Sequence, residues 1–104
     1  MPKYLLAYHG GGMPATPEEG ERVMKAWNDW YGLLGPAIAD GGAPTGRART
    51  VAASGAVAEG GGGNPITGYT VIEAANLERA TELATGCPIR AAGGSIEVCE
   101  CIQM

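Results

Sequence analysis

Two residues of this chain are candidates for a catalytic acid–base pair. His9 is the only histidine, and it ends a strand-like run just before Gly10–Gly12. An imidazole titrates near neutrality and often serves as a general base. The carboxylate of Asp40 could orient such a base or bind a substrate hydroxyl. We therefore predict His9 and Asp40 as the catalytic pair of an active site; the plainer alternatives are a hydrogen-bonded structural histidine and a turn-forming aspartate.

Aromatic and basic residues supply candidate ligand contacts. Trp27 and Trp30 are three residues apart on one face of a predicted helix, and Tyr8 directly precedes the histidine. The tryptophans are either a stacking wall for a ligand or part of a core between helix and sheet. Arg47 and Arg49 alternate in a strand-like stretch, where they would clamp a carboxylate or line a solvated face. The predicted ligand-binding residues are Tyr8, Trp27, Trp30 and Arg49.

The cysteines and glycines do not form cofactor motifs. Cys99 and Cys101 alternate along a strand-like stretch, so their thiols share a face, either as a metal pair or as small buried hydrophobic side chains. Only His9 and Cys87 remain to complete four zinc ligands, so no metal is predicted. Gly10–Gly12 lacks the third glycine of a dinucleotide motif and the Lys-Ser or Lys-Thr of a P-loop. We expect no cofactor, and three cysteines without framework spacing favour a reducing, cytoplasmic location.

The length and charge of the chain limit what it can be. Residues 1–104 are enough for one domain, and 45% hydrophobic with 17% charged residues is typical of a globular protein. The apolar runs are too short for a transmembrane span, and the start of the chain does not read as a secretory signal. A net charge of -4 argues against nucleic acid and anionic membranes as partners.

Local signals predict the first two elements. Lys3–His9 is apolar at both alternating sets of positions, which indicates a strand covered on both faces. Thr16 is a helix N-cap, with Pro17 at the first helical position and Glu19 placed for a capping box. Gly35-Pro36 should interrupt this helix.

The rest of the chain predicts three more strands and a second helix. A turn is expected at Asp40–Pro44 and a strand at Thr45–Ser54, followed by a glycine-rich loop at Glu59–Pro65. The remaining predicted elements are a strand at Tyr69–Ile72, a helix capped by Asn76 and a strand at Ser95–Ile102.

This element order predicts an α+β protein of the ferredoxin-like βαββαβ type. Right-handed crossovers would place both helices on one face of an antiparallel sheet. The other face is then bare in a monomer, yet the first strand is apolar on both faces, with Tyr4, Leu6 and Tyr8 on one and Leu5 and Ala7 on the other. An exposed apolar face of this kind predicts a homodimer with the bare faces packed together.

Several segments, in this order and spacing, resemble the YCII-related family, in particular its DGPF-type branch. They are Lys3–Tyr8, Trp27 and Trp30 before Leu34-Gly35, Asp40, Gly68–Ala74, Cys87-Pro88 and Gly93–Val98. The resemblance covers nearly the whole chain. It implies a ferredoxin-like subunit that pairs sheet to sheet into a dimeric α+β barrel.

The resemblance also implies a function. It implies that a small organic molecule, a ring compound or an acid, binds in a barrel pocket, and that the protein is either a cofactor-free lyase or isomerase or a non-catalytic binding protein linked to sigma-factor transcription. Relatives with a catalytic histidine and aspartate carry the histidine early in the first helix, where this chain has Arg22–Ala26. The Glu59–Asn64 glycine loop takes the place of the Asp-Gly-Pro-Phe tetrapeptide.

Overall fold

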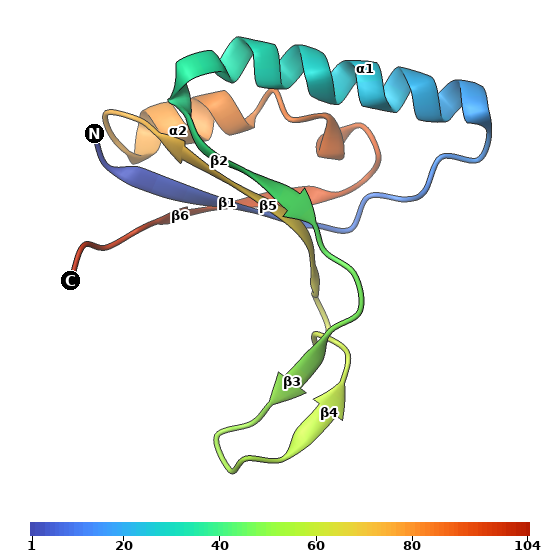
Figure 1. The fold of residues 1–104 in the computed structure, drawn as a ribbon, viewed down its shortest axis with the longest axis vertical. Coiled ribbons are helices and arrows are strands. Elements are labelled where there is room, and N and C mark those ends of the chain that lie inside the picture. Colours follow the sequence, from blue (N-terminus) through green and yellow to red (C-terminus); the bar gives the residue numbers. More distant parts are fainter.

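The structure, a computed structural model, describes residues 1–104 and has the α+β class predicted from the sequence (Figure 1). Neither helix combines the length and apolar character needed to cross a membrane. In chain order the elements are β1 (Lys3–His9), α1 (Pro17–Leu34), β2 (Ile38–Pro44), β3 (Arg49–Val51), β4 (Val57–Glu59), β5 (Ile66–Glu73), α2 (Leu77–Ala84) and β6 (Ser95–Glu100).

Four of the strands form one antiparallel sheet in the order β2-β5-β1-β6. Helices α1 and α2 both cover the same face of this sheet, and β1 lies in its interior (Figure 1). The arrangement is compatible with a ferredoxin-like fold. In the register of the central strands, Leu5 lies opposite Val71 of β5 and Cys99 of β6. These three side chains therefore share the helix-free face.

Both helices begin where the capping residues predict. The Thr16 hydroxyl accepts a hydrogen bond from the backbone N–H of Glu19 at 3.1 Å. The Asn76 side chain accepts one from the backbone N–H of Arg79 at 2.8 Å. Helix α1 ends at Leu34, because the following Gly35–Ala37 segment turns into a short 3₁₀ helix around Pro36.

The core lies between the helices and one face of the sheet. Tyr4, Leu6 and Tyr8 of β1 are buried there, as are Ile72 of β5 and Trp30 of α1. On the opposite face Ala7 is buried and Leu5 is half-buried, so the prediction that β1 is apolar on both faces is confirmed.

The strand predicted at Thr45–Ser54 is present only as the short β3, Arg49–Val51, which is not part of the four-stranded sheet, and the predicted turn at Asp40–Pro44 is wrong. The second strand of the sheet is β2, Ile38–Pro44, which pairs with β5 through two irregularities in register. Gly42 has φ +69°, and its backbone lies so close to Tyr69 that a Cβ would overlap the Tyr69 carbonyl. A glycine-rich segment can therefore serve as a strand here, because the missing side chain allows the backbones to approach.

Residues 45–65 instead form an arm that contains the β3–β4 hairpin. β3 and β4 pair only with each other, in a separate two-stranded sheet. The arm leaves the body between β2 and β5 and projects on the helix-free side of the sheet (Figure 1). With the arm, the molecule measures 43 × 42 × 18 Å along its three principal axes.

Candidate functional site

A cavity of about 420 Å³ lies between the start of α1 and the two segments that pack against it. The segments are the Gly11–Pro14 loop before the helix and the stretch Pro88–Ala92 before β6. The lining is mainly apolar, with Val23, Ala26, Trp27 and Ile89 among the residues. Its volume is in the range of small-molecule sites, about 300–1,000 Å³.

Glycine packing brings these segments together. Gly11 has φ +79° and lies against Ile89, and a Cβ on Gly94 would come within 2.6 Å of the His9 carbonyl oxygen. Larger residues at either position would push the loop away from the segment before β6. The glycines that the sequence places at these two turns therefore set the distance across the cavity.

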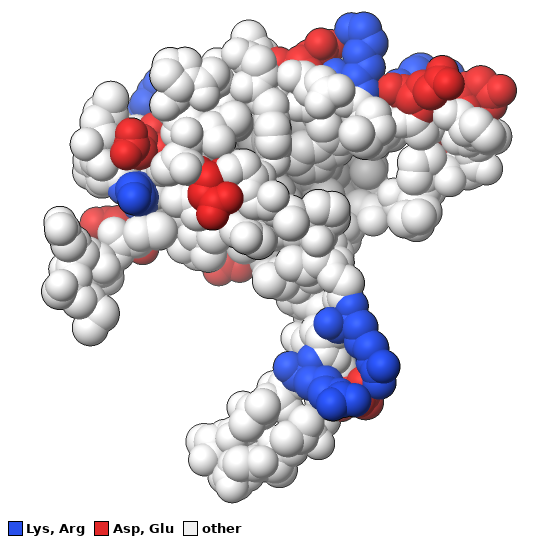
Figure 2. Space-filling view, viewed as in Figure 1, with Lys and Arg blue, Asp and Glu red and all other residues white.

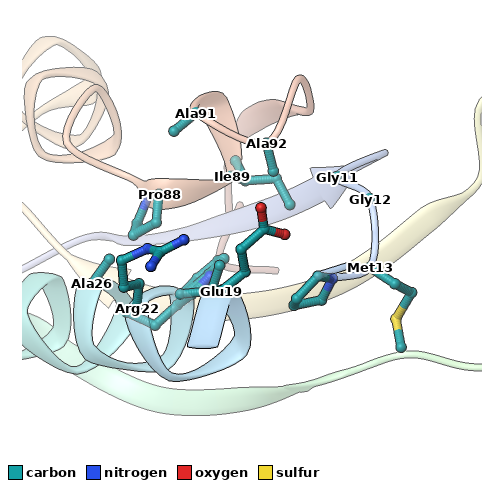
Figure 3. A pocket seen from close by; sticks show the side chains of 13 residues that line it. Gly11, Gly12, Met13, Glu19, Arg22, Ala26, Pro88, Ile89, Ala91 and Ala92 are labelled. Atoms are coloured by element: carbon teal, nitrogen blue, oxygen red, sulfur yellow. The ribbon is translucent and has the colours of Figure 1, made fainter. Parts of the chain in front are cut away.

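Two charged side chains of α1, Glu19 and Arg22, lie one turn apart at this cavity. Figure 3 shows both reaching from the helix toward the segment that carries Pro88, Ile89 and Ala92. The Glu19 carboxylate accepts a hydrogen bond from the backbone N–H of Ala15 at 2.9 Å. Arg22 has no hydrogen-bond or ion-pair partner in the chain, so its guanidinium is free to bind a carboxylate.

Of the aromatic residues predicted to bind a ligand, one lines the cavity and two belong to the hydrophobic core. The Trp27 ring lines the cavity and lies edge-on to Tyr8, with ring centroids 5.1 Å apart. Trp30 is 3% exposed and donates a hydrogen bond from Nε1 to the Leu83 carbonyl at 3.0 Å. The Tyr8 hydroxyl donates to Thr70 Oγ1 at 2.7 Å, and burial raises the pKa of this phenol. Of the aromatic residues predicted to bind a ligand, only Trp27 lines the cavity.

His9 lies on the helix-free face, where both ring nitrogens meet acceptors. Nδ1 is 3.1 Å from the Asn64 carbonyl oxygen and 3.2 Å from that of Pro65, and Nε2 is 3.0 Å from Glu97 Oε1. Carbonyl and carboxylate oxygens accept, so an N–H on either nitrogen has a partner. His9 thereby joins the base of the arm to β6. Both ring nitrogens thus face oxygens of the chain, and His9 does not line the cavity.

Asp40 and Arg49 lie away from His9. Asp40 pairs with Val71, and Val71 pairs with Leu5, so Asp40 lies level with Leu5 in the sheet. Leu5 is four residues before His9 in β1, which is about 13 Å along the strand. Asp40 Oδ1 accepts from the Gly42 N–H at 2.8 Å, in the manner of a turn-forming aspartate. Arg49 is on the arm and forms an ion pair with Glu59 at 2.8 Å. The single chain therefore does not bring the predicted catalytic pair together.

The cysteines remain thiols in this structure. Burial raises the pKa of the Cys87 thiol to about 11. Burial and the neighbouring Glu97 carboxylate raise the pKa of Cys99. Cys101 is exposed, beyond the end of β6, so the alternative of two small buried side chains does not hold for it. No three His, Cys, Asp or Glu side chains converge into a potential metal-binding group.

Sequence reasoning did not single out two residues that lie at the cavity or beside His9, Arg22 and Glu97. Arg22 has a local signal, since it lies one turn after Glu19, but only the approach of residues 88–92 makes that helix face a cavity wall. Glu97 faces His9 because β6 pairs antiparallel with β1, with Ala7 opposite Glu97. The sequence could have indicated this register. The alternating patterns of β1 and β6 can be aligned so that the apolar positions of both strands face the helices.

Comparison with known proteins assigns no chemistry to this cavity. No protein-family model matches the chain, and no curated protein matches it. The chemistry of the cavity must therefore be argued from its own side chains.

Removing the imidazole of His9 should loosen the base of the arm without unfolding the body. We expect His9→Ala to speed amide exchange near Ile66 and Thr67 by at least about tenfold, because Asn64 and Pro65 lose their contact with β1 and β6. Hydrogen exchange with peptide-level mass spectrometry measures this. The control is Glu97→Gln, whose amide oxygen can still accept from Nε2. Unchanged exchange in His9→Ala would show that the imidazole does not hold the arm.

Proposed function

We propose that this chain is a YCII-related domain of the DGPF type, with a ferredoxin-like subunit that binds a small organic acid and pairs as a homodimer. The helix-free sheet faces would pack against each other to form a dimeric α+β barrel. Two observations support the family proposal. The segments that resemble the family run through nearly the whole chain, and the sheet order is compatible with such a subunit.

The position of Arg22 at the cavity is the observation that supports an organic acid as the ligand. Its guanidinium has no partner within the chain, and the adjacent wall consists of Val23, Trp27 and Ile89. An apolar group, best a flat ring, would pack on this wall, while its carboxylate would accept hydrogen bonds from Arg22. Glu19 favours a ligand that also carries a donor, such as a hydroxyl.

A binding role fits the other contacts better than a catalytic one. A general base needs a free nitrogen within hydrogen-bond reach of its substrate. Both nitrogens of His9 lie within 3.2 Å of protein acceptors. Asp40 is occupied by the Gly42 N–H. The two residues predicted for catalysis thus make structural contacts, His9 with the arm and β6, and Asp40 within β2.

The ligand proposal is tested by titrating the protein with phenylacetate and following tryptophan fluorescence, which Trp27 should report. We expect Arg22→Gln to weaken phenylacetate binding about 10- to 100-fold, the effect of losing a charge-assisted hydrogen bond. The control is Lys25→Gln on the same helix, since Lys25 pairs with Asp29 at 2.8 Å and does not line the cavity.

The neutral analogue phenylacetamide separates charge from packing. The wild type and Arg22→Gln should bind the amide with similar affinity, because the apolar wall is unchanged. If Arg22→Gln binds phenylacetate as well as the wild type does, the cavity does not select acids through this residue. If neither compound changes the fluorescence, the cavity is not the site of an aromatic acid.

A further inference from the structure

The arm formed by residues 45–65 has apolar side chains at its tip that nothing in its own chain covers. Val51 and Val57 face each other across the hairpin and remain 69% and 62% exposed. An isolated two-stranded hairpin is at best marginally stable in water. A hairpin of this kind is expected to be stabilised by packing against another surface.

The surface area of the chain is large for its mass. The accessible surface is 7020 Å² for 10.6 kDa. A compact monomer of this mass exposes about 5,500 Å². The excess of roughly 1,500 Å² is more than the ~800 Å² that each partner buries in a standard protein–protein interface. The radius of gyration, 15.0 Å, likewise exceeds the roughly 13 Å of a compact chain of this length.

The direction of the arm identifies what it would meet. It projects on the helix-free side of the sheet, the side that carries Leu5, Ala7 and Val71 (Figure 1). Two packed sheets lie about 10 Å apart, whereas the seven residues from Ala48 to Ser54 span about 23 Å when extended. If a second copy packs on this face, the arm of one protomer therefore reaches past the sheet of the other protomer and lies along the flank of that protomer.

The charges of the arm and the body are complementary. The arm contains Arg47, Arg49 and one acidic residue, Glu59, so its net charge is +1. The rest of the chain has five basic and ten acidic residues, a net charge of -5. Figure 2 shows the basic side chains of the arm near its base, beside acidic atoms, and an uncharged tip beyond them. Such an arm is attracted to a second acidic body.

We propose that the arm of each protomer clasps a second copy of this chain, with the Val51 and Val57 tip packed on the flank of the partner. The proposal rests on the sheet-to-sheet dimer suggested above and adds a second, reciprocal contact to it. Twofold symmetry makes the contact isologous, so each dimer has two clasps. The partner then covers the apolar tip that the chain itself leaves exposed.

Sedimentation equilibrium of Val51→Glu tests the clasp. We expect the dimer dissociation constant to rise at least about tenfold, because each dimer would bury two carboxylates against apolar surface. Val51 is exposed, so the monomer should tolerate the change, and circular dichroism checks this. The matched control is Met24→Glu, also at an exposed apolar residue (62%), on α1 away from the arm. It should dimerise like the wild type.

A third variant separates the clasp from the sheet contact. Val71→Lys places a charge on the helix-free face and should weaken the dimer whether or not the arm contributes. If Val71→Lys weakens the dimer but Val51→Glu does not, the clasp is overturned and sheet pairing stands. A wild type that stays monomeric at about 100 μM overturns both. The phenylacetate titration is a separate measurement, so failure of the ligand proposal is distinguishable from either result.

Discussion

Gly42→Ala should lower the free energy of unfolding by at least about 3 kcal/mol, an unusually large effect for adding one methyl group. Gly42 has φ +69°, a conformation that costs a residue with a side chain about 1–2 kcal/mol. The new Cβ would also overlap the Tyr69 carbonyl oxygen, which belongs to the backbone of β5 and cannot rotate away. Relief requires β2 to separate from β5.

The adjacent glycine provides the control for this prediction. A Cβ on Gly41 would have no atom within 4 Å, and Gly41 does not have a positive φ. Gly41→Ala should therefore be neutral or stabilise the protein by about 0.4–1 kcal/mol. Urea denaturation of the two variants measures the difference. Equal midpoints would mean that β2 does not pair with β5 through Gly42.

Thr70→Val should lower the free energy of unfolding by about 1–3 kcal/mol although the two side chains have nearly the same shape. Thr70 is fully buried, and its hydroxyl accepts from the Tyr8 hydroxyl at 2.7 Å. It also lies 2.8 Å from the Tyr31 hydroxyl. Tyr31 keeps the Gly41 carbonyl as an acceptor at 2.9 Å, whereas Tyr8 would lose its partner. The expected loss is the cost of that unpaired buried hydroxyl.

The double variant Tyr8→Phe/Thr70→Val tests this explanation. Removing both hydroxyls leaves no unpaired group, so the double variant should be more stable than the two single losses predict. Thr81→Val, at an exposed threonine of α2, is the control and should change stability by less than about 0.5 kcal/mol. Additive losses in the cycle would show that Tyr8 and Thr70 do not interact.

Elements with strong local signals could be predicted from the sequence. Thr16 and Asn76 define the helix starts through hydrogen bonds to residues three positions on, so no tertiary information is needed. The apolar pattern of Lys3–His9 similarly predicts β1. The second strand was missed because Asp40–Pro44 has the composition of a turn. Its strand conformation depends on Tyr69, whose carbonyl only a glycine can approach so closely.

Only the part of the candidate site that has a local sequence signal could be predicted. Trp27 lies on the apolar stripe of the first helix, and it does line the cavity. The opposite wall comes from Ile89 and its neighbours, which are distant in sequence and carry no signal of their own. The role of His9 as a catalytic base stays a prediction, and its observed partners are protein oxygens. The contacts of His9 depend on the strand register that places Glu97 beside it and on the arm that brings Asn64 close.

The place of β1 in the sheet has a consequence for the order of folding. Lys3 pairs with Glu73 and Tyr4 with Glu100, so the strand formed by the first residues has both its neighbours far along the chain. Closing such long loops costs entropy before any pairing energy is gained, which slows folding. Until Ser95–Glu100 is in place, one edge of β1 stays open to strands from other molecules. A folding intermediate that lacks β6 should therefore be the species most prone to aggregate.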